Sequence, residues 1–380
     1  MKILHLHDSP HLHGGATQYL NQSLQALKGR DVRSYLFSIG PQIESPFIEH
    51  HFAFDYSLPP SRLQRRRDFY GNCASLRESL AAALAESAAD LIHVHNCANF
   101  RSTVFSTILN SNLPSIMTVH DFSLDWKSSP QRRDGGAKAF VANQLNRRQH
   151  QRSRQLVIDS IDLFLCPTQA ILDGLNLPSA KSRVHRLPIA EAECSELAKN
   201  KLRMLFAGTL FHSKGVDVLL EALRALNEHD IDFSLEIAGS GDLASQLQAI
   251  CSEFGISDRV EFLGQLDGHQ MNLAYQRANL LVLPSRVPEN SPLTVLEAGA
   301  RGRPAVASHA GGVPELIDSS RGWTFPSENS AELANILRSI ADDLSIIAIR
   351  GQKMRKWVRN EFAPAGHWQQ LEQHYNSLIS

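Results

Sequence analysis

Cysteine and long apolar runs are both scarce in this chain of 380 residues. The five cysteines are scattered and include no C-x-x-C pair, so the sequence indicates neither a disulfide framework nor a cysteine zinc site. No stretch approaches the roughly 18 consecutive apolar residues that a membrane helix needs. The opening MKILHLHDSP reaches His and Asp before the apolar core of a signal peptide could form, so we expect a cytoplasmic protein.

Glycine-rich nucleotide fingerprints are also incomplete. The nearest approach to a dinucleotide-binding turn is GSGDL at 239–243, which lacks the third glycine and a correctly placed ribose-binding acid. An NAD-dependent oxidoreductase is therefore disfavoured. No sequence period of roughly 20–50 residues is present, which argues against a solenoid.

Charge is balanced overall but unevenly distributed. The formal net charge is −1, yet residues 1–190 carry 21 Lys and Arg against 15 Asp and Glu, and residues 191–380 carry 17 against 24. Much of the basic excess lies in 62–67 and 127–154. Two interpretations stay open: a solvated basic face, or a surface for an anionic acceptor or the periphery of an anionic membrane. Nucleic acid is not expected as a partner, because neither aromatic interleaving nor a recognised binding motif accompanies the charge.

Short β-rich runs alternate with longer helical stretches along the chain. LIHVH (91–95) and PSIMTVH (114–120) look like strands, and the pattern restarts after residue 190 with LRMLFAG. Nearly continuous apolar strands separated by helices predict parallel sheets covered on both faces. We therefore expect two doubly wound α/β domains, residues 1–190 and 191–360, facing a central cleft. Residues 361–380 have apolar positions at helical spacing and predict one more helix.

The segment PSRVPENSPLTVLEAGARGRPAVAS has the chemistry best suited to a ligand. Ser291 is a good N-cap and Pro292 suits a first helical turn, so a helix is predicted to begin there. Exposed amides at such a start can hold a phosphate. Glu289 and Glu297 could then accept hydrogen bonds from sugar hydroxyls on either side. Taken singly, either carboxylate is better explained as a surface group near a helix start.

Three further loops follow strand-like runs. Lys214, at the opening of a helix, could neutralise a diphosphate leaving group, although loop lysines are usually solvated. Gly14 and Gly15 would let the backbone approach a ligand closely, and a simple tight turn explains them equally well. His120 ends a strand, where either an active residue or a satisfied structural histidine would lie.

Three H-x-H pairs also occur. Strand alternation puts both members of a pair on one face, so metal binding is geometrically possible. No carboxylate-rich or cysteine-rich partner set accompanies them, so we interpret them as polar strand-end residues and expect no metal. The pairs are His5/His7, His11/His13 and His93/His95.

In this order, these segments resemble the retaining glycosyltransferases of family 4, which have the GT-B fold. Glu289 and Glu297 meet the E-x7-E signature of that family, and the resemblance is strongest over 202–317. It implies two Rossmann-like domains, with residues 361–380 crossing back to the first. It also implies metal-independent transfer of a sugar, with retention, from a nucleoside diphosphate sugar to a hydroxyl acceptor. The acceptor would be a glycan, a lipid-linked glycan or a small molecule, and the nucleotide sugar is a co-substrate, so no other cofactor is expected.

The resemblance assigns roles to individual residues. Glu289 would contact the transferred sugar, Glu297 the ribose, and His120 the donor sugar. Lys214 would hold the diphosphate, so His120, Lys214 and Glu289 are the candidate catalytic residues. The other donor-binding candidates are the glycine loop Gly14 and Gly15, Thr209 in the Lys214 loop, the base-pocket residues Gly239, Gly241 and Leu266, and the helix start Asn290, Ser291, Pro292 and Leu293.

The chain departs from the family pattern near the diphosphate. Thr209 stands where the family often has an arginine, so either Lys214 carries more of the charge or another basic residue replaces the arginine. Alternatives to a transferase stay open: a sugar phosphorylase or epimerase of the same fold, or a non-catalytic nucleotide-sugar-binding protein.

Overall fold

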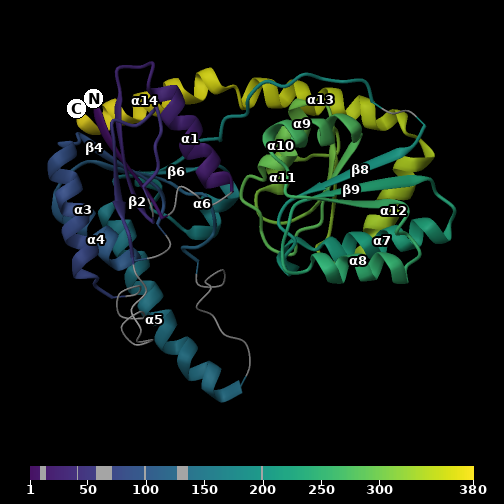
Figure 1. Cartoon of the computed structure of the whole chain (residues 1–380), viewed down its shortest axis with the longest axis horizontal. Coiled ribbons are helices and arrows are strands. Elements are labelled where there is room, and N and C mark those ends of the chain that lie inside the picture. The colour runs from purple at the N-terminus through teal and green to yellow at the C-terminus, as the bar shows by residue number, and fades with distance from the viewer. Residues whose placement is uncertain (9–13, 41, 57–70, 98–99, 126–135, 198–199) are drawn as a thin grey trace. The chain divides into compact units, whose positions relative to one another are not determined.

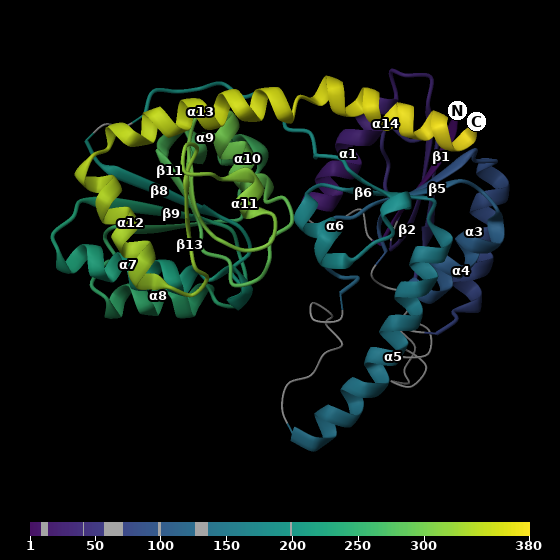
Figure 2. The same ribbon diagram turned by 180° about the vertical axis from the view of Figure 1, so that it is seen from behind.

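The chain divides into two compact units, which Figures 1 and 2 show from opposite sides. The computed structural model describes residues 1–8, 14–40, 42–56, 71–97, 100–125, 136–197 and 200–380. Unit 1 comprises Met1–Leu187 with Ala365–Ser380, and unit 2 comprises Pro188–Pro364. The division falls three residues before the expected boundary at 190. The predictions for His11, His13, residues 62–67 and residues 127–134 lie outside the described residues.

Unit 1 is built on a seven-stranded parallel sheet with the order β3-β2-β1-β4-β5-β6-β7. Its strands are β1 (Lys2–His7), β2 (Arg33–Ile39), β3 (His50–Phe54), β4 (Leu91–Asn96), β5 (Ser115–Thr118), β6 (Leu163–Cys166) and β7 (Ser182–Val184). Its helices are α1 (Gly15–Leu27), α3 (Ala74–Ser87), α4 (Arg101–Ser111), α5 (Gly136–Ser160), α6 (Gln169–Leu175) and α14 (Pro364–Ile379), with a short turn η2 (Ser179–Lys181).

The two faces of the unit 1 sheet differ in chemistry. Strand alternation sends Leu4 of β1 and Ile92 of β4 into the core beneath α3 and α4. His5 and His93, their neighbours in sequence, face the other way, where α14 covers them. One face is therefore apolar, and the other places buried histidines among apolar residues such as Leu36 and Ile116.

Unit 2 is built on a six-stranded parallel sheet with the order β10-β9-β8-β11-β12-β13. Its strands are β8 (Leu202–Ala207), β9 (Phe233–Ala238), β10 (Val260–Gly264), β11 (Leu280–Leu283), β12 (Ala305–Ser308) and β13 (Trp323–Phe325). Its helices are α7 (Val216–Glu228), α8 (Ala244–Glu253), α9 (Gly268–Arg277), α10 (Leu293–Ala300), α11 (Val313–Leu316), α12 (Ser330–Asp342) and α13 (Ser345–Glu361), with a short turn η3 (His212–Lys214). The expected architecture of two doubly wound parallel sheets is confirmed.

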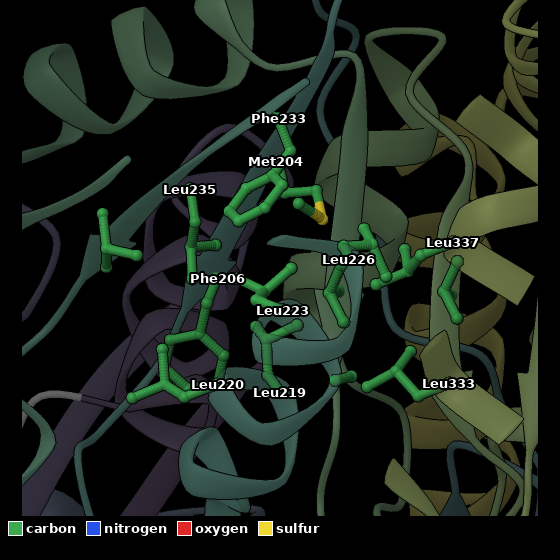
Figure 3. Packing of buried hydrophobic residues seen from close by; sticks show 14 of the residues in the cluster. Met204, Phe206, Leu219, Leu220, Leu223, Leu226, Phe233, Leu235, Leu333 and Leu337 are labelled. Carbon is green, nitrogen blue, oxygen red and sulfur yellow. The ribbon is translucent and has the colours of Figure 1, made fainter. Parts of the chain in front are cut away.

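The core of unit 2 forms where α7 and α12 pack on the sheet (Figure 3). Met204 and Phe206 of β8 point into this layer, while Leu205 between them faces α9, α10 and α13 on the opposite side. Helix α7 contributes leucines at helical spacing, and each fully buried leucine stabilises the fold by about 1.5–3 kcal/mol. These leucines are Leu219, Leu220, Leu223 and Leu226.

Among the described helices, none combines the length and apolar character needed to cross a membrane. The long helix α5 is the clearest example, since its 25 residues include several arginines. Arg147, Arg148 and Arg152 are exposed on it.

Candidate functional site

The strand order of unit 2 reverses between β8 and β11. The chain runs outward from β8 through β9 and β10, and then returns to place β11 on the other side of β8. Loops that leave neighbouring strands in opposite directions at such a switch point open a crevice at the carboxyl end of the sheet. The loop after β8 carries Lys214, and the loop after β11 carries Glu289.

Lys214 and Glu289 meet at this switch point. The Lys214 ammonium lies 2.7 Å from Glu289 Oε1, and the two side chains are 27% and 15% exposed. The Ser285 hydroxyl donates to the same oxygen at 2.5 Å. Because both bonds use Oε1, Oε2 can accept a hydrogen bond from a ligand. Two sequence candidates that lie 75 positions apart thus form one partly exposed ion pair.

The backbone of Glu289 is held separately from its side chain. Its carbonyl oxygen accepts a hydrogen bond from the Gly312 amide at 2.7 Å, and Glu289 forms an isolated parallel bridge with Gly311. A Cβ at Gly311 would lie only 2.1 Å from that carbonyl oxygen. Position 311, in the loop after β12, therefore has to be glycine for Glu289 to stay in place.

We expect Gly311→Ala to destabilise unit 2 strongly. The added methyl group must displace the Glu289 backbone, and overpacking of this kind costs about 1–3 kcal/mol beyond the strain of a positive φ. Gly255→Ala is the matched control, because Gly255 has φ +65° against +61° for Gly311 and no heavy atom within 4 Å of its Cβ position. The free energy of unfolding in urea measures both variants. Equal losses would show that the Glu289 contact is unimportant.

A clamp that the sequence did not reveal fixes the Lys214 loop. The Arg286 guanidinium binds both carboxylate oxygens of Asp217 at 2.6 and 2.7 Å and also donates to the His212 carbonyl oxygen. The hydrogen bonds that Arg286 donates to Asp217 raise the pKa of Arg286. Gly215, with φ +64°, ends η3 so close to Pro284 that a Cβ would lie 2.1 Å from the Pro284 carbonyl oxygen. The loops after β8 and β11 are therefore locked against each other.

The helix start after Glu289 differs from the prediction. Helix α10 begins at Leu293, and Pro292 is its N-cap, without a side-chain capping bond. Ser291 was expected to be the N-cap, and this is wrong: its buried hydroxyl has no hydrogen-bond partner among the described residues. Pro292 takes the capping position because its ψ of 106° is extended. The amides of Leu293 and Thr294 still lack an intrahelical acceptor, which keeps this helix start suited to an anion.

Glu297 lies in the second turn of α10 and has a partner from α9. The Tyr275 hydroxyl donates to Glu297 Oε2 at 2.9 Å, and the Arg301 guanidinium lies 4.8 Å from the centre of the tyrosine ring. Burial and the nearby Glu297 carboxylate raise the pKa of Tyr275 well above its usual value. The sequence analysis missed both Tyr275 and Arg301, because only the fold brings α9 beside α10.

The glycines predicted to line a base pocket lie at the same edge of the sheet. A Cβ on Gly239 would lie 1.8 Å from the Gly208 carbonyl oxygen, and one on Gly241 would lie 2.5 Å from that of Leu210. The turn after β9 thus runs directly against the loop after β8, which contains the exposed Thr209.

Leu266 follows β10 at this edge and is partly buried against the core beneath α9. The Gly239 amide donates to the Gly264 carbonyl oxygen at 2.8 Å, which ties the turn after β9 to the end of β10. The loops after β8, β9 and β10 therefore lie in sequence along one edge, and every predicted site residue of unit 2 lies in them or in the segment from Glu289 to Glu297.

The remaining candidates lie in unit 1. Gly14 precedes α1 and is exposed, and Gly15 is the first residue of that helix. His120 follows β5, with its ring centre 5.4 Å from that of Tyr19. Burial, with a smaller effect from His7, lowers the pKa of His120 to about 3. His120 is therefore a neutral imidazole at physiological pH.

His7 ends β1, as expected of a strand-end residue, but His5 and His93 lie within β1 and β4, so the strand-end interpretation is wrong for these two. His5, His93 and His95 are fully buried, with one ring nitrogen of each within 4.8 Å of the others. By position alone, this trio could hold a metal ion. His5 and His93 already use both ring nitrogens in hydrogen bonds, which include a 2.9 Å bond from His5 to His95 and a 2.7 Å bond from His93 to the Tyr375 hydroxyl.

Comparison with known proteins covers nearly the whole chain. Residues 190–360 match the family model of glycosyl transferases group 1, and residues 13–188 match that of glycosyltransferase family 4. An uncharacterized glycosyltransferase from Methanocaldococcus jannaschii is 34% identical over 142 residues, which cover 37% of this chain and 36% of the relative. The amylovoran biosynthesis glycosyltransferase AmsK of Erwinia amylovora is 28% identical over 201 residues, which cover 50% and 49%. The matches thus span about a third to a half of the length of these relatives.

Solved structures resemble the chain over its full length. HepE from Anabaena, in complex with UDP and glucose, aligns over 100% of both chains with a TM-score of 0.77 and 18% identity. At that identity, the likeness concerns the fold. Taken together with the two family models, it identifies the architecture of the two parallel-sheet units. The chain belongs to glycosyltransferase family 4 and has the GT-B type of fold.

Proposed function

We propose that this protein transfers a sugar from a nucleoside diphosphate sugar to a hydroxyl acceptor, with retention at the anomeric carbon. The observation that carries the proposal is the Lys214–Glu289 ion pair at the switch point of unit 2, directly before the start of α10. A cation, an acceptor carboxylate and helix amides together suit a sugar linked to a diphosphate.

Each group has a role in holding the donor. Glu289 Oε2 accepts hydrogen bonds from the transferred sugar, and Glu297 accepts them from the ribose. The amides at the start of α10 and the Lys214 ammonium bind the diphosphate. The base lies by Leu266 and the turn that contains Gly239. The glycine loop of unit 1 contributes backbone close to the phosphates.

The chemical step breaks the bond between the anomeric carbon and the diphosphate oxygen. The acceptor hydroxyl oxygen forms the new bond on the same face of the sugar, and its proton passes to the departing phosphate oxygen. Lys214 stabilises the negative charge that develops on the diphosphate, so we propose a metal-independent step. His120, neutral because burial lowers its pKa to about 3, exchanges a hydrogen bond with the donor sugar without adding charge to the site.

The relatives support a role in polysaccharide synthesis. AmsK acts in amylovoran biosynthesis, and HepE was solved with UDP and glucose. We therefore propose a glycan, lipid-linked glycan or small-molecule acceptor. The exposed arginines Arg147, Arg148 and Arg152 of α5 are suited to an anionic acceptor or to the periphery of an anionic membrane on the cytoplasmic side.

A thermal-shift panel of UDP-, GDP- and ADP-sugars tests donor binding. One base is expected to raise the melting temperature by several degrees, since a ligand at 100 times its Kd contributes about 2.7 kcal/mol. Product analysis with that donor, with and without acceptors, then tests the reaction. An isomerised donor sugar without acceptor would indicate an epimerase, and phosphate-dependent release of a sugar phosphate would indicate a phosphorylase. Binding without any turnover would leave only a nucleotide-sugar-binding protein.

A further inference from the structure

Tyr275 makes a specific contact that the proposed function does not yet use. The residue lies on α9, is 1% exposed, and directs its hydroxyl at Glu297 Oε2 over 2.9 Å. Its ring packs in the core that contains Val295 and Leu296 of α10. The tyrosine therefore meets α10 through both its apolar ring and its polar tip.

The surroundings of Tyr275 hold it rigidly. The fully buried Arg303 donates to the Tyr275 carbonyl oxygen at 3.0 Å and to that of Ala278 at 3.2 Å, which fixes the end of α9. Arg301 lies over the ring, donates to the Glu297 carbonyl oxygen at 2.8 Å, and donates from Nε to Asn272 at 2.9 Å. Arg303 thus holds the backbone of Tyr275, and Arg301 connects the tyrosine ring to the backbone of Glu297.

We infer that Tyr275 is a positioning residue for Glu297, holding the carboxylate in the orientation that binds the ribose hydroxyls of the donor. The inference rests on the proposed function, which assigns Glu297 to the ribose. A carboxylate offers about four lone-pair sites, so it can accept the bond from Tyr275, which orients it, and also hydrogen bonds from ribose hydroxyls. A partly exposed glutamate without such a bond samples several rotamers, and ligand binding then has to overcome that entropy.

The protonation state of Tyr275 suits this role. Burial and the adjacent Glu297 carboxylate raise its pKa well above the usual value, so the hydroxyl remains a hydrogen-bond donor throughout the physiological range. A permanent donor beside the Glu297 side chain orients it through the 2.9 Å bond to Oε2.

The test compares binding of UDP, GDP and ADP with that of their 2′,3′-dideoxy forms. For the base that it recognises, wild type is expected to bind the ribonucleotide more tightly than the 2′,3′-dideoxy form. Glu297→Gln is expected to lose most of this preference for ribose. Tyr275→Phe is expected to weaken ribonucleotide binding about tenfold and dideoxynucleotide binding little. With the donor sugar, the same variant should raise KM and change kcat less than twofold, as loss of uniform binding requires.

Tyr375→Phe is the matched control. Tyr375 is also fully buried, and its hydroxyl lies 2.7 Å from a side chain, His93, but it belongs to unit 1 and not to the α9–α10 pair. This variant should keep the full ribose preference. Because that preference is a ratio of two affinities of the same preparation, it does not depend on the fraction of protein that is folded.

Each other outcome overturns a defined claim. If Glu297→Gln loses the ribose preference and Tyr275→Phe keeps it, the positioning role is wrong and the proposed function stands. Equal weakening of both nucleotide forms by Tyr275→Phe would mean that the tyrosine only packs, which also ends the inference. If Glu297→Gln keeps the preference, or no nucleoside diphosphate binds wild type, the donor assignment of the proposed function fails.

Discussion

Replacing Lys214 with alanine is expected to lower kcat for sugar transfer by about two to three orders of magnitude, which corresponds to ~2.7–4 kcal/mol of transition-state stabilisation. The ammonium lies in a loop locked by Arg286 and Gly215, so it is fixed before the diphosphate begins to leave. Its loss also leaves the Glu289 carboxylate without its 2.7 Å cation, which adds repulsion toward the departing diphosphate. Initial rates at saturating donor measure the effect.

Stability should change far less than turnover in this variant. The ion pair is partly exposed, and such pairs contribute about 1 kcal/mol or less to folding. Lys201→Ala is the control, because Lys201 also pairs with a carboxylate, that of Asp232 at 2.9 Å, but precedes β8 at the opposite end of the strand. It should keep normal turnover. Near-normal turnover of Lys214→Ala at saturating donor would refute the catalytic role of Lys214.

Mild acid is expected to destabilise unit 1 steeply. Burial lowers the pKa of His5 and His120 to about 3, and that of His367 to about 4, from the usual 6.5. The folded protein keeps these imidazoles neutral, whereas the unfolded chain protonates them near pH 6.5. Their stabilisation is therefore complete above pH 6.5 and is lost as the pH falls from there toward the folded-state values. Within that window, each histidine lowers the free energy of unfolding by about 1.4 kcal/mol for every pH unit of acidification. The three histidines together lower it by about 4 kcal/mol per pH unit.

Hydrogen exchange between pH 7.5 and 5 can follow this loss unit by unit. Unit 2 is an internal control, because its histidines His212, His229, His269 and His309 are all exposed. Protection in unit 1 should fall much faster with acidification than protection in unit 2, after correction for the intrinsic exchange rate. His367→Gln should flatten the dependence by about one proton. Parallel loss of protection in both units would contradict the claim that the buried histidines of unit 1 cause its loss of stability in mild acid.

The sequence predicts the architecture of this protein well, because each buried strand can be recognised from a short run of neighbouring residues. Strands buried on both faces of a parallel sheet are apolar nearly throughout, so β4 and β8 are visible as short runs such as LIHVH and LRMLFAG. Glu289, Glu297 and Lys214 are candidates for the same local reason, since their residue types lie at or near predicted helix starts, and their roles stay predictions. The ion pair between Lys214 and Glu289, by contrast, exists only because β8 and β11 are neighbours in the sheet.

The wrong predictions have two causes. Two neighbouring residues were equally good helix caps, and some buried side chains have hydrogen-bond partners far away in the sequence. Ser291 and Pro292 are both good helix-start residues, and the sequence alone does not decide which one caps α10. A polar side chain within a buried strand needs a hydrogen-bond partner. Because no such partner is apparent near His5 or His93 in the sequence, the two histidines were expected at strand ends. Those partners include Tyr375, which lies 282 positions after His93.

The return of α14 to unit 1 affects the order in which a ribosome can complete the protein. Pro188–Pro364 is continuous in the chain, so unit 2 can fold as soon as this stretch has left the exit tunnel. Unit 1 needs Ala365–Ser380 as well, since His93 and Tyr19 find Tyr375 and His367 only there. The half that is synthesised first is therefore finished last, and its histidine-lined face stays open to water, or to a chaperone, until translation reaches α14.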